Sequence, residues 1–201
     1  MVLGHRGINL YSGVSTDGSP DLELDVTGTL ETVNASITLS PGVNGVVKGN
    51  VIAGGTGSDV TINSARTLTI HGKLIANDKI TLTAGTLVSS GQASITTTGA
   101  SKLLSTGGNG EIVMTGFNDV VIDSLVGPGS TNLALIRIES TEGTTYLKKT
   151  SGWIETGALI RILGADLHFE GVLRSTQATA NTSDFEVELT ATDDAVLHPK
   201  A

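Results

Sequence analysis

The side chains best suited to catalysis in this sequence are two aspartates that flank a short apolar run. Asp119 precedes and Asp123 follows Val120-Val121-Ile122, so the two carboxylates could project close to one another. Paired carboxylates are the groups that polysaccharide-cleaving enzymes use for acid–base chemistry. Capping of the turns at the two ends of the run is the simpler interpretation, because Asp readily hydrogen-bonds to nearby backbone.

Metal and nucleophile chemistry have little support in the residue types. The chain has no cysteine, which excludes thiol catalysis and Cys-ligated zinc, and no serine lies in a Gly-x-Ser-x-Gly elbow. The histidines are not paired at metal-ligand spacing. They are His5, His71, His168 and His198. We therefore predict that the chain is not an enzyme and has no catalytic residue, no metal site and no cofactor.

One glycine-rich segment nearly matches a calcium-binding nonapeptide. Residues 54–62 read Gly-Gly-Thr-Gly-Ser-Asp-Val-Thr-Ile, but Thr61 occupies the position that the motif reserves for an apolar residue. Calcium sites of this type form between tandem copies, and this chain has one copy. A glycine turn that leads into a strand is the simpler interpretation. A strand with its acids facing outward likewise explains Asp17, Asp21, Glu23 and Asp25 better than a calcium site does.

Four residues in the second half are the best candidates for a binding patch. Arg137 and Arg161 lie in the phrase Ala-Leu-Ile-Arg-Ile, which occurs at 134–138 and again at 158–162. If that spacing is one coil of a solenoid, the two guanidinium groups stack about 4.8 Å apart on one outer face. Such like charges need a carboxylate or a ligand between them. The available acids are Glu139, Glu155 and Glu170. A ladder of ion pairs is one interpretation; the other is a ligand patch formed by Arg137, Tyr146, Trp153 and Arg161.

Pairs of threonines separated by one residue suggest a different kind of surface. Flat ladders of threonine can order water, as in ice-binding solenoids. The pairs are Thr27/Thr29, Thr67/Thr69, Thr81/Thr83, Thr96/Thr98 and Thr190/Thr192. The three central pairs follow one another at spacings shorter than one coil, so we expect them on different faces. Ice binding is accordingly a remote alternative.

The elements that would position these residues are very short strands. Apolar and polar residues alternate in triplets along the whole chain, which is the period of a strand with one buried face. The clearest triplets are residues 60–62, 68–70, 80–82, 95–97, 112–114, 120–122, 136–138, 160–162 and 167–169. No triplet can form a two-layer sheet alone, but triplets stacked as coils of a solenoid share one continuous core.

These patterns predict an all-β fold, a single parallel β-helix with about 20–24 residues and three short strands in each coil. The spacing of the repeated phrase, applied in both directions from Ile136, places Ile112, Ile136 and Ile160 in one interior ladder. Nine or ten coils would then form a rod roughly 45 Å long. The alternative is an all-β sandwich, which needs hairpin turns. The only Asp-Gly and Asn-Gly candidates are Asp17-Gly18, Asn44-Gly45 and Asn109-Gly110.

Composition limits the partners and the organisation of the chain. The formal net charge of −8 makes nucleic acid an unsuitable partner. No apolar run approaches the roughly 18 residues of a membrane-spanning helix, so we expect no membrane insertion. We expect residues 1–201 to be one β-helix segment of a larger protein. Residues 1–20 would be irregular, and residues 190–201 would be a fraying end.

Two phrases resemble the repeats of filamentous haemagglutinin-type large bacterial exoproteins. Residues 72–85 read Gly-Lys-Leu-Ile-Ala-Asn-Asp-Lys-Ile-Thr-Leu-Thr-Ala-Gly, and residues 60–64 read Val-Thr-Ile-Asn-Ser. In that family, Gly-x-Leu/Ile-x-Ala turns alternate with Ile-Thr-Leu-x-Ala strands. The resemblance is best over residues 28–125. It implies a right-handed parallel β-helix that is secreted or exported to the bacterial cell surface and used for adhesion.

The expected function is that of a structural and adhesive rod. Its partners would be host or environmental glycans or proteins, or neighbouring segments of the same parent protein. The alternative is a glycan-binding or polysaccharide-degrading β-helix, whose sign would be a deep groove with exposed aromatic residues and paired carboxylates.

Overall fold

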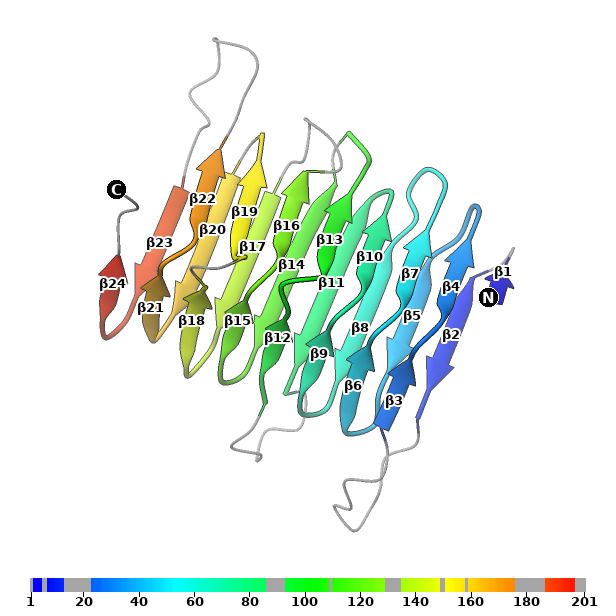
Figure 1. Ribbon diagram of the computed structural model, residues 1–201, viewed down its shortest axis with the longest axis horizontal. Helices are drawn as coiled ribbons and strands as arrows, with labels where there is room; N and C mark the ends of the chain where they lie inside the picture. Colours follow the sequence, from blue (N-terminus) through cyan, green and yellow to red (C-terminus); the bar gives the residue numbers. More distant parts are fainter. Residues whose placement is uncertain are drawn as a thin grey trace.

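The fold is a three-sided solenoid of parallel strands. The computed structural model describes residues 2–4, 7–12, 23–85, 93–108, 110–128, 135–148, 151–157, 159–175 and 187–197. Within these ranges the chain forms strands and no helix, and so no helix that could cross a membrane. The strands form three sheets of eight, and neighbours pair in parallel (Figure 1). The predicted all-β parallel β-helix is therefore confirmed.

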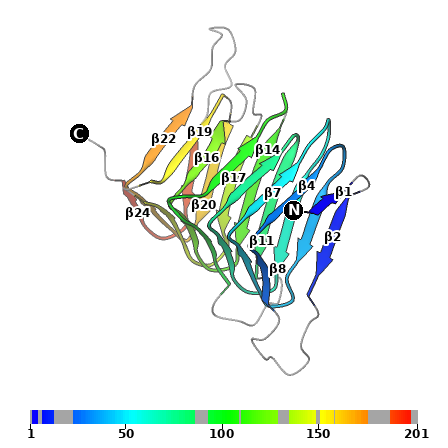
Figure 2. The ribbon, with the colours of Figure 1, turned by 45° about the vertical axis from the view of Figure 1, so that its right-hand side comes forward.

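Consecutive strands along the chain belong to consecutive sheets, so three strands make one coil (Figure 2). Sheet A contains β1 (Val2–Gly4), β4 (Thr29–Thr32), β7 (Asn50–Ala53), β10 (Lys73–Ala76), β13 (Lys102–Ser105), β16 (Leu125–Pro128), β19 (Trp153–Thr156) and β22 (Val172–Ser175). Sheet B contains β2 (Ile8–Tyr11), β5 (Ile37–Ser40), β8 (Val60–Ser64), β11 (Lys79–Ala84), β14 (Glu111–Gly116), β17 (Leu135–Ser140), β20 (Leu159–Gly164) and β23 (Val187–Ala191). Sheet C contains β3 (Glu23–Val26), β6 (Asn44–Val47), β9 (Leu68–Ile70), β12 (Ile95–Thr97), β15 (Val120–Ile122), β18 (Thr144–Leu147), β21 (Asp166–Phe169) and β24 (Ala195–Leu197).

Alternation of residue type decides which side of each strand faces the interior. In β11, the buried residues are Ile80, Leu82 and Ala84, and the intervening Thr81 and Thr83 face outward. The buried apolar side chains of all three sheets form one cluster. All nine predicted triplets lie inside strands, so the period-two pattern located the strands correctly. Asn44-Gly45, a candidate hairpin turn, instead lies inside β6.

The predicted interior ladder is present. Ile112 is the register partner of Ile136, which in turn is the partner of Ile160. All three are fully buried. The ladder continues on the amino-terminal side through Ile80 and Val60. Side chains of the same branched shape therefore stack along the axis of the solenoid, which fixes the register of sheet B.

The coils vary in length beyond the predicted range of about 20–24 residues. The coil from Trp153 to its register partner Val172 is shorter than this range, whereas the coil from Ile80 to its partner Ile112 is longer. The strands are held in register, so the additional residues of a long coil lie between strands; residues 85–94, for example, separate β11 from β12. The prediction of nine or ten coils is wrong for this reason. Eight strands per sheet correspond to a length of about 34 Å.

Parts of the two ends that were predicted to be irregular belong to strands. β1 pairs with β4 and β2 with β5, so residues 2–4 and 8–11 belong to the first coil. At the other end, β24 pairs with β21. Residues 13–22, with Asp17-Gly18, and residues 198–201, with His198, lie outside the described residues.

Glycines allow the coils to stack closely at the corner between sheets C and A. Gly28, Gly49 and Gly72 follow β3, β6 and β9, and the amide of Gly72 donates to the carbonyl of Val47 at 3.0 Å. A Cβ on Gly72 would lie 1.6 Å from the oxygen of Gly49, and one on Gly49 would lie 1.8 Å from the oxygen of Gly28. A Cβ on Gly28 would meet nothing within 4 Å. The second and third glycines of this column therefore exclude a side chain, and the first does not.

Gly72→Ala is expected to lower the free energy of unfolding by about 3 kcal/mol, because the new methyl group overlaps the backbone of the preceding coil. Gly28→Ala is the matched control at the same corner and should change that free energy by less than about 1 kcal/mol. Urea denaturation followed by circular dichroism measures both. Equal effects of the two substitutions would contradict the close backbone stacking.

Candidate functional site

The four residues predicted to form one patch lie on three different faces. Arg137 in β17 and Arg161 in β20 face outward from sheet B, Tyr146 in β18 from sheet C, and Trp153 in β19 from sheet A. Residues 137 and 161 are one coil apart, so the chain between them contributes strands to all three sheets. The structure therefore brings the two arginines together and separates them from the two aromatic residues.

The two arginines form the ion-paired ladder that was one of the two interpretations. Arg137 and Arg161 are register partners. Nη2 of Arg137 donates to Oε2 of Glu139 at 2.7 Å, and Nε of Arg161 donates to a carboxylate oxygen of Glu188. Each positive charge is thus compensated within the protein. Both pairs are partly exposed, so each contributes little to stability.

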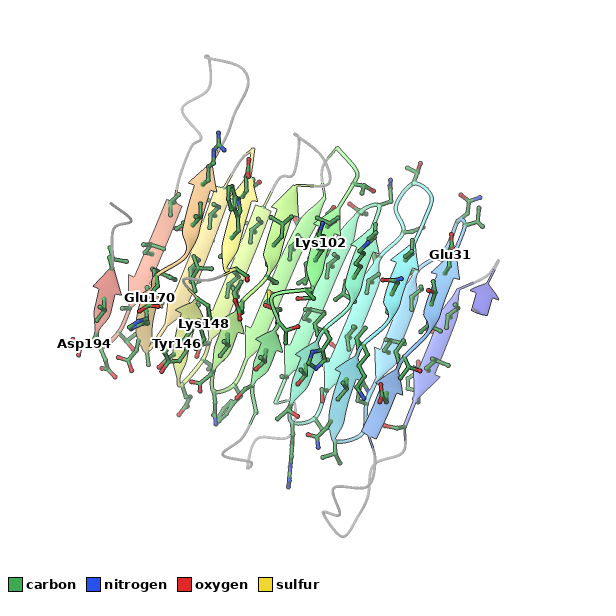
Figure 3. The ribbon with its side chains drawn as sticks, in the orientation of Figure 1. Glu31, Lys102, Tyr146, Lys148, Glu170 and Asp194 are labelled. Carbon is green, nitrogen blue, oxygen red and sulfur yellow. The ribbon has the colours of Figure 1, made fainter. Side chains whose placement is uncertain are left out.

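A group of aromatic and charged side chains lies on the outer face of sheet C, in β18 and β21 and in the residues that follow these strands. The ring centroids of Tyr146 and His168 are 5.7 Å apart, and Nζ of Lys148 is 5.6 Å from the centroid of Tyr146. Nε2 of His168 is 3.4 Å from Oε1 of Glu170. Figure 3 shows Tyr146, Lys148 and Glu170 close together, with Asp194 nearby on the next coil. Of this group, Tyr146 was predicted to lie in a binding patch, whereas Lys148, His168 and Glu170 were not.

A shallow hollow of about 240 Å³ opens beside this group. Its lining residues are Thr144, Tyr146, Asp166, Leu167, His168, Asp194 and Val196. Oδ1 of Asp166 accepts a hydrogen bond from the backbone amide of Asp194 at 3.2 Å, which ties the last two coils together. Hydroxyl, imidazole and carboxylate groups around an aromatic ring are the chemistry that a small polar ligand such as a sugar requires.

Of the two aspartates first considered for catalysis, Asp119 links neighbouring coils through its carboxylate, whereas Asp123 does so through its backbone amide. Oδ1 of Asp119 accepts a hydrogen bond from the amide of Thr144 in the next coil at 3.0 Å, as the capping interpretation expects. The amide of Asp123 donates to Oγ1 of Thr97 at 3.1 Å, and its own Oδ1 is buried without a hydrogen-bond partner. In the part of the chain that the structure describes, no three His, Cys, Asp or Glu side chains are grouped as metal ligands.

The segment that resembles a calcium motif also links coils. Oδ1 of Asp59 accepts from the amide of Lys79 at 3.0 Å, and the amide of Gly57 donates to Oδ1 of Asn77 at 3.2 Å. Gly57 has a positive φ of 72°, which its turn requires. The turn interpretation of this segment is therefore supported by its contacts.

Outward threonines occur on all three faces, since Thr29 lies in β4 of sheet A. Thr81 and Thr83 lie in β11 of sheet B, whereas Thr69 and Thr96 are register partners in sheet C. The expectation that the three central pairs lie on different faces is therefore wrong for the first and the third. On sheet B, Thr81 and Thr83 continue a ladder over three strands, which also contains Thr38, Ser40, Thr61 and Asn63. This ladder is not evident in the sequence, because Ser40 and Asn63 interrupt the threonine pattern and because the coils differ in length.

The described residues thus form a solenoid whose outer faces differ in chemistry. Sheet B carries hydroxyl side chains and then the arginine ladder, sheet C carries the hollow beside Tyr146, and sheet A carries Trp153. Comparison of the chain with family models, curated proteins and solved structures gave no match.

Proposed function

We propose that this chain is a rod-forming segment of a large bacterial protein that is secreted or displayed at the cell surface. The observation that carries the proposal is the apolar interior, which runs as one cluster through all three sheets. In a solenoid each coil contacts only its neighbours, so the number of coils sets the length of the rod without altering its local structure. Reach and stiffness are the properties that such a segment supplies.

Adhesion is the second part of the proposal. Each coil adds one row of outward side chains to each face, so a rod presents its contact groups repeatedly along its length. Host or environmental glycans or proteins, or neighbouring segments of the same parent protein, are the partners we infer. Many weak contacts along one stiff body add up to firm attachment, because each further contact is made at a high effective concentration.

A second candidate function is glycan binding at one position of the rod. The observation that favours it is the hollow on sheet C, where Tyr146 and His168 lie beside the carboxylates of Asp166 and Asp194. An aromatic ring beside hydrogen-bonding groups suits the alternating apolar and hydroxyl-bearing surfaces of a sugar.

Surface display tests both functions in one experiment. A non-adherent bacterium would display the chain on an outer-surface anchor, and attachment to protein-coated and glycan-coated glass would be counted under flow. We expect more attached cells than with the anchor alone. Tyr146→Ala should abolish only the attachment to glycan if the hollow binds sugars, and should change nothing if the rod acts through distributed contacts. Attachment no greater than that of the anchor alone would contradict the adhesive function.

A further inference from the structure

The outer face of sheet A carries an apolar stripe that the rod itself does not require. Six successive strands of this sheet, from β7 to β22, each place one apolar side chain outward. These residues are Ile52, Ile75, Leu104, Leu125, Trp153 and Val172. The first three are register partners in one column and the last three in the neighbouring column, so the stripe crosses the sheet obliquely.

Because of the stripe, strands of sheet A occur in the sequence as continuous apolar runs rather than as alternating apolar and polar residues. Val51-Ile52-Ala53 and Leu74-Ile75-Ala76 are continuous apolar runs, which are typical of parallel strands covered on both faces. The core covers the inner residues of each run, whereas Trp153 in the stripe keeps 37% of its surface exposed. At the corresponding outward positions of β5, β8 and β11, sheet B carries Thr, Ser and Asn. Farther along, sheet B also has outward apolar residues, at Val113, Leu135 and Leu159, but an unbroken row over six successive strands is found, among the described residues, on sheet A.

Charged residues border the stripe: Lys73 and Lys102 lie at its middle, Glu31 at one end, and Glu155 and Arg174 at the other. Lys73 and Lys102 are exposed register partners on adjacent strands, which places them about 4.8 Å apart in the direction of the sheet. Among the described residues, neither lysine forms an ion pair. Like charges at this separation repel one another. Unlike Arg137 and Arg161, each of which has its own glutamate, the two lysines are available to carboxylates of a partner.

We propose that the outer face of sheet A binds an amphipathic α-helix whose apolar side is bordered by acidic residues. Six strands span about 24 Å, the length of about 16 helical residues. One apolar side chain per strand makes a narrow stripe, which fits the single apolar side of a helix. To bind the flat face of a second β-sheet, the strands of sheet A would need apolar residues at both of their outward positions. A second copy of this chain would place Lys73 and Lys102 of both copies at the interface, where like charges repel one another (Lys102 is labelled in Figure 3). This inference does not depend on the adhesive function.

The test uses Trp153, the only tryptophan of the chain, as the reporter. The probe is a synthetic helical peptide of about 18 residues that contains Leu, Ala and Glu, with leucines along one side and glutamates at its borders. We expect the peptide to shift Trp153 emission to shorter wavelength and to protect the ring from acrylamide in a saturable manner. Ile75→Ser should weaken binding about tenfold. Val113→Ser, an outward substitution on β14 of sheet B, is the matched control and should leave binding unchanged.

A charge exchange tests the acidic border. The Lys73→Glu/Lys102→Glu variant should bind the glutamate-bordered peptide about tenfold more weakly, and should bind a lysine-bordered peptide of the same design more tightly than the unmodified chain does. Absence of protection at about 1 mM peptide would overturn the proposal, as would equal binding of a scrambled peptide. Protection by phosphatidylglycerol vesicles without protection by the peptide would assign the stripe to a lipid surface instead. If protection of Trp153 increased with protein concentration in the absence of peptide, the stripe would instead be assigned to a second copy of the chain.

Discussion

Replacing Ile136 with Asp is expected to lower the free energy of unfolding by about 4 kcal/mol or more, enough to unfold much of the chain. Ile136 is fully buried, and Ile112 and Ile160 lie directly on either side of it in the interior ladder. The carboxylate would lose its water without gaining a partner, because its neighbours along the ladder are aliphatic. Urea and thermal denaturation followed by circular dichroism measure the loss.

Two controls separate this effect from a general sensitivity of β17. Ile136→Val removes one methyl group from the same position and should cost about 1 kcal/mol. Arg137→Ala alters the next residue, which faces outward, and should cost no more than about 1 kcal/mol because its ion pair with Glu139 is partly exposed. A melting temperature of the Ile136→Asp variant equal to that of the unmodified chain would mean that Ile136 does not face the core.

Removal of one whole coil is expected to leave a folded solenoid. Deletion of residues 60–79 removes β8, β9 and β10, and joins Asp59 to Ile80. Ile80 is the register partner of Val60, so it can take the place of Val60 on Ile37 in the ladder of sheet B. The shortened chain should unfold cooperatively and be shorter by about 4.8 Å in small-angle X-ray scattering.

Removal of two thirds of the same coil should have a much larger effect. Deletion of residues 60–72 removes β8 and β9 but retains β10, so β10 and all later strands would have to move into the wrong sheet. The corner between sheets C and A would then be misplaced in every later coil. We expect this variant to lose its cooperative unfolding transition. If the two deletions gave equally folded proteins, the three-strand coil would not be the unit of the fold.

The strands of this protein and their buried residues could be predicted from its sequence, because alternation of residue type is a local property. Val60-Thr61-Ile62 alternates apolar and polar residues in the sequence, and these alternate between inward and outward in β8. The repeated phrase around Arg137 and Arg161 gave the register of two adjacent coils. Each of these inferences needed only neighbouring residues or one repeated phrase.

The outer faces were not readable in the same way. Tyr146 and His168 are register partners across a short coil, whereas Ile80 and Ile112 are partners across a much longer one, so no single period identifies which outward residues are neighbours. Proximity in sequence was misleading for Tyr146 and Trp153, which lie on different sheets. On sheet A, the sequence does not distinguish Ile75 from a core residue. An outward apolar residue next to an inward one produces the continuous apolar run that is typical of a strand buried on both faces.

Distances between spin labels along one face test most directly that the chain is a single straight rod. The chain lacks cysteine, so pairs of cysteines can be introduced at outward positions of sheet B without interference. Labels at Thr38 and at Arg137, Arg161 or Glu188 would be four, five and six strands apart in this sheet. For stacked coils we expect pulsed electron paramagnetic resonance to give separations that grow by about 4.8 Å per coil, near 19, 24 and 29 Å. Separations that do not increase in this order would contradict the solenoid and the proposed rod function that depends on it.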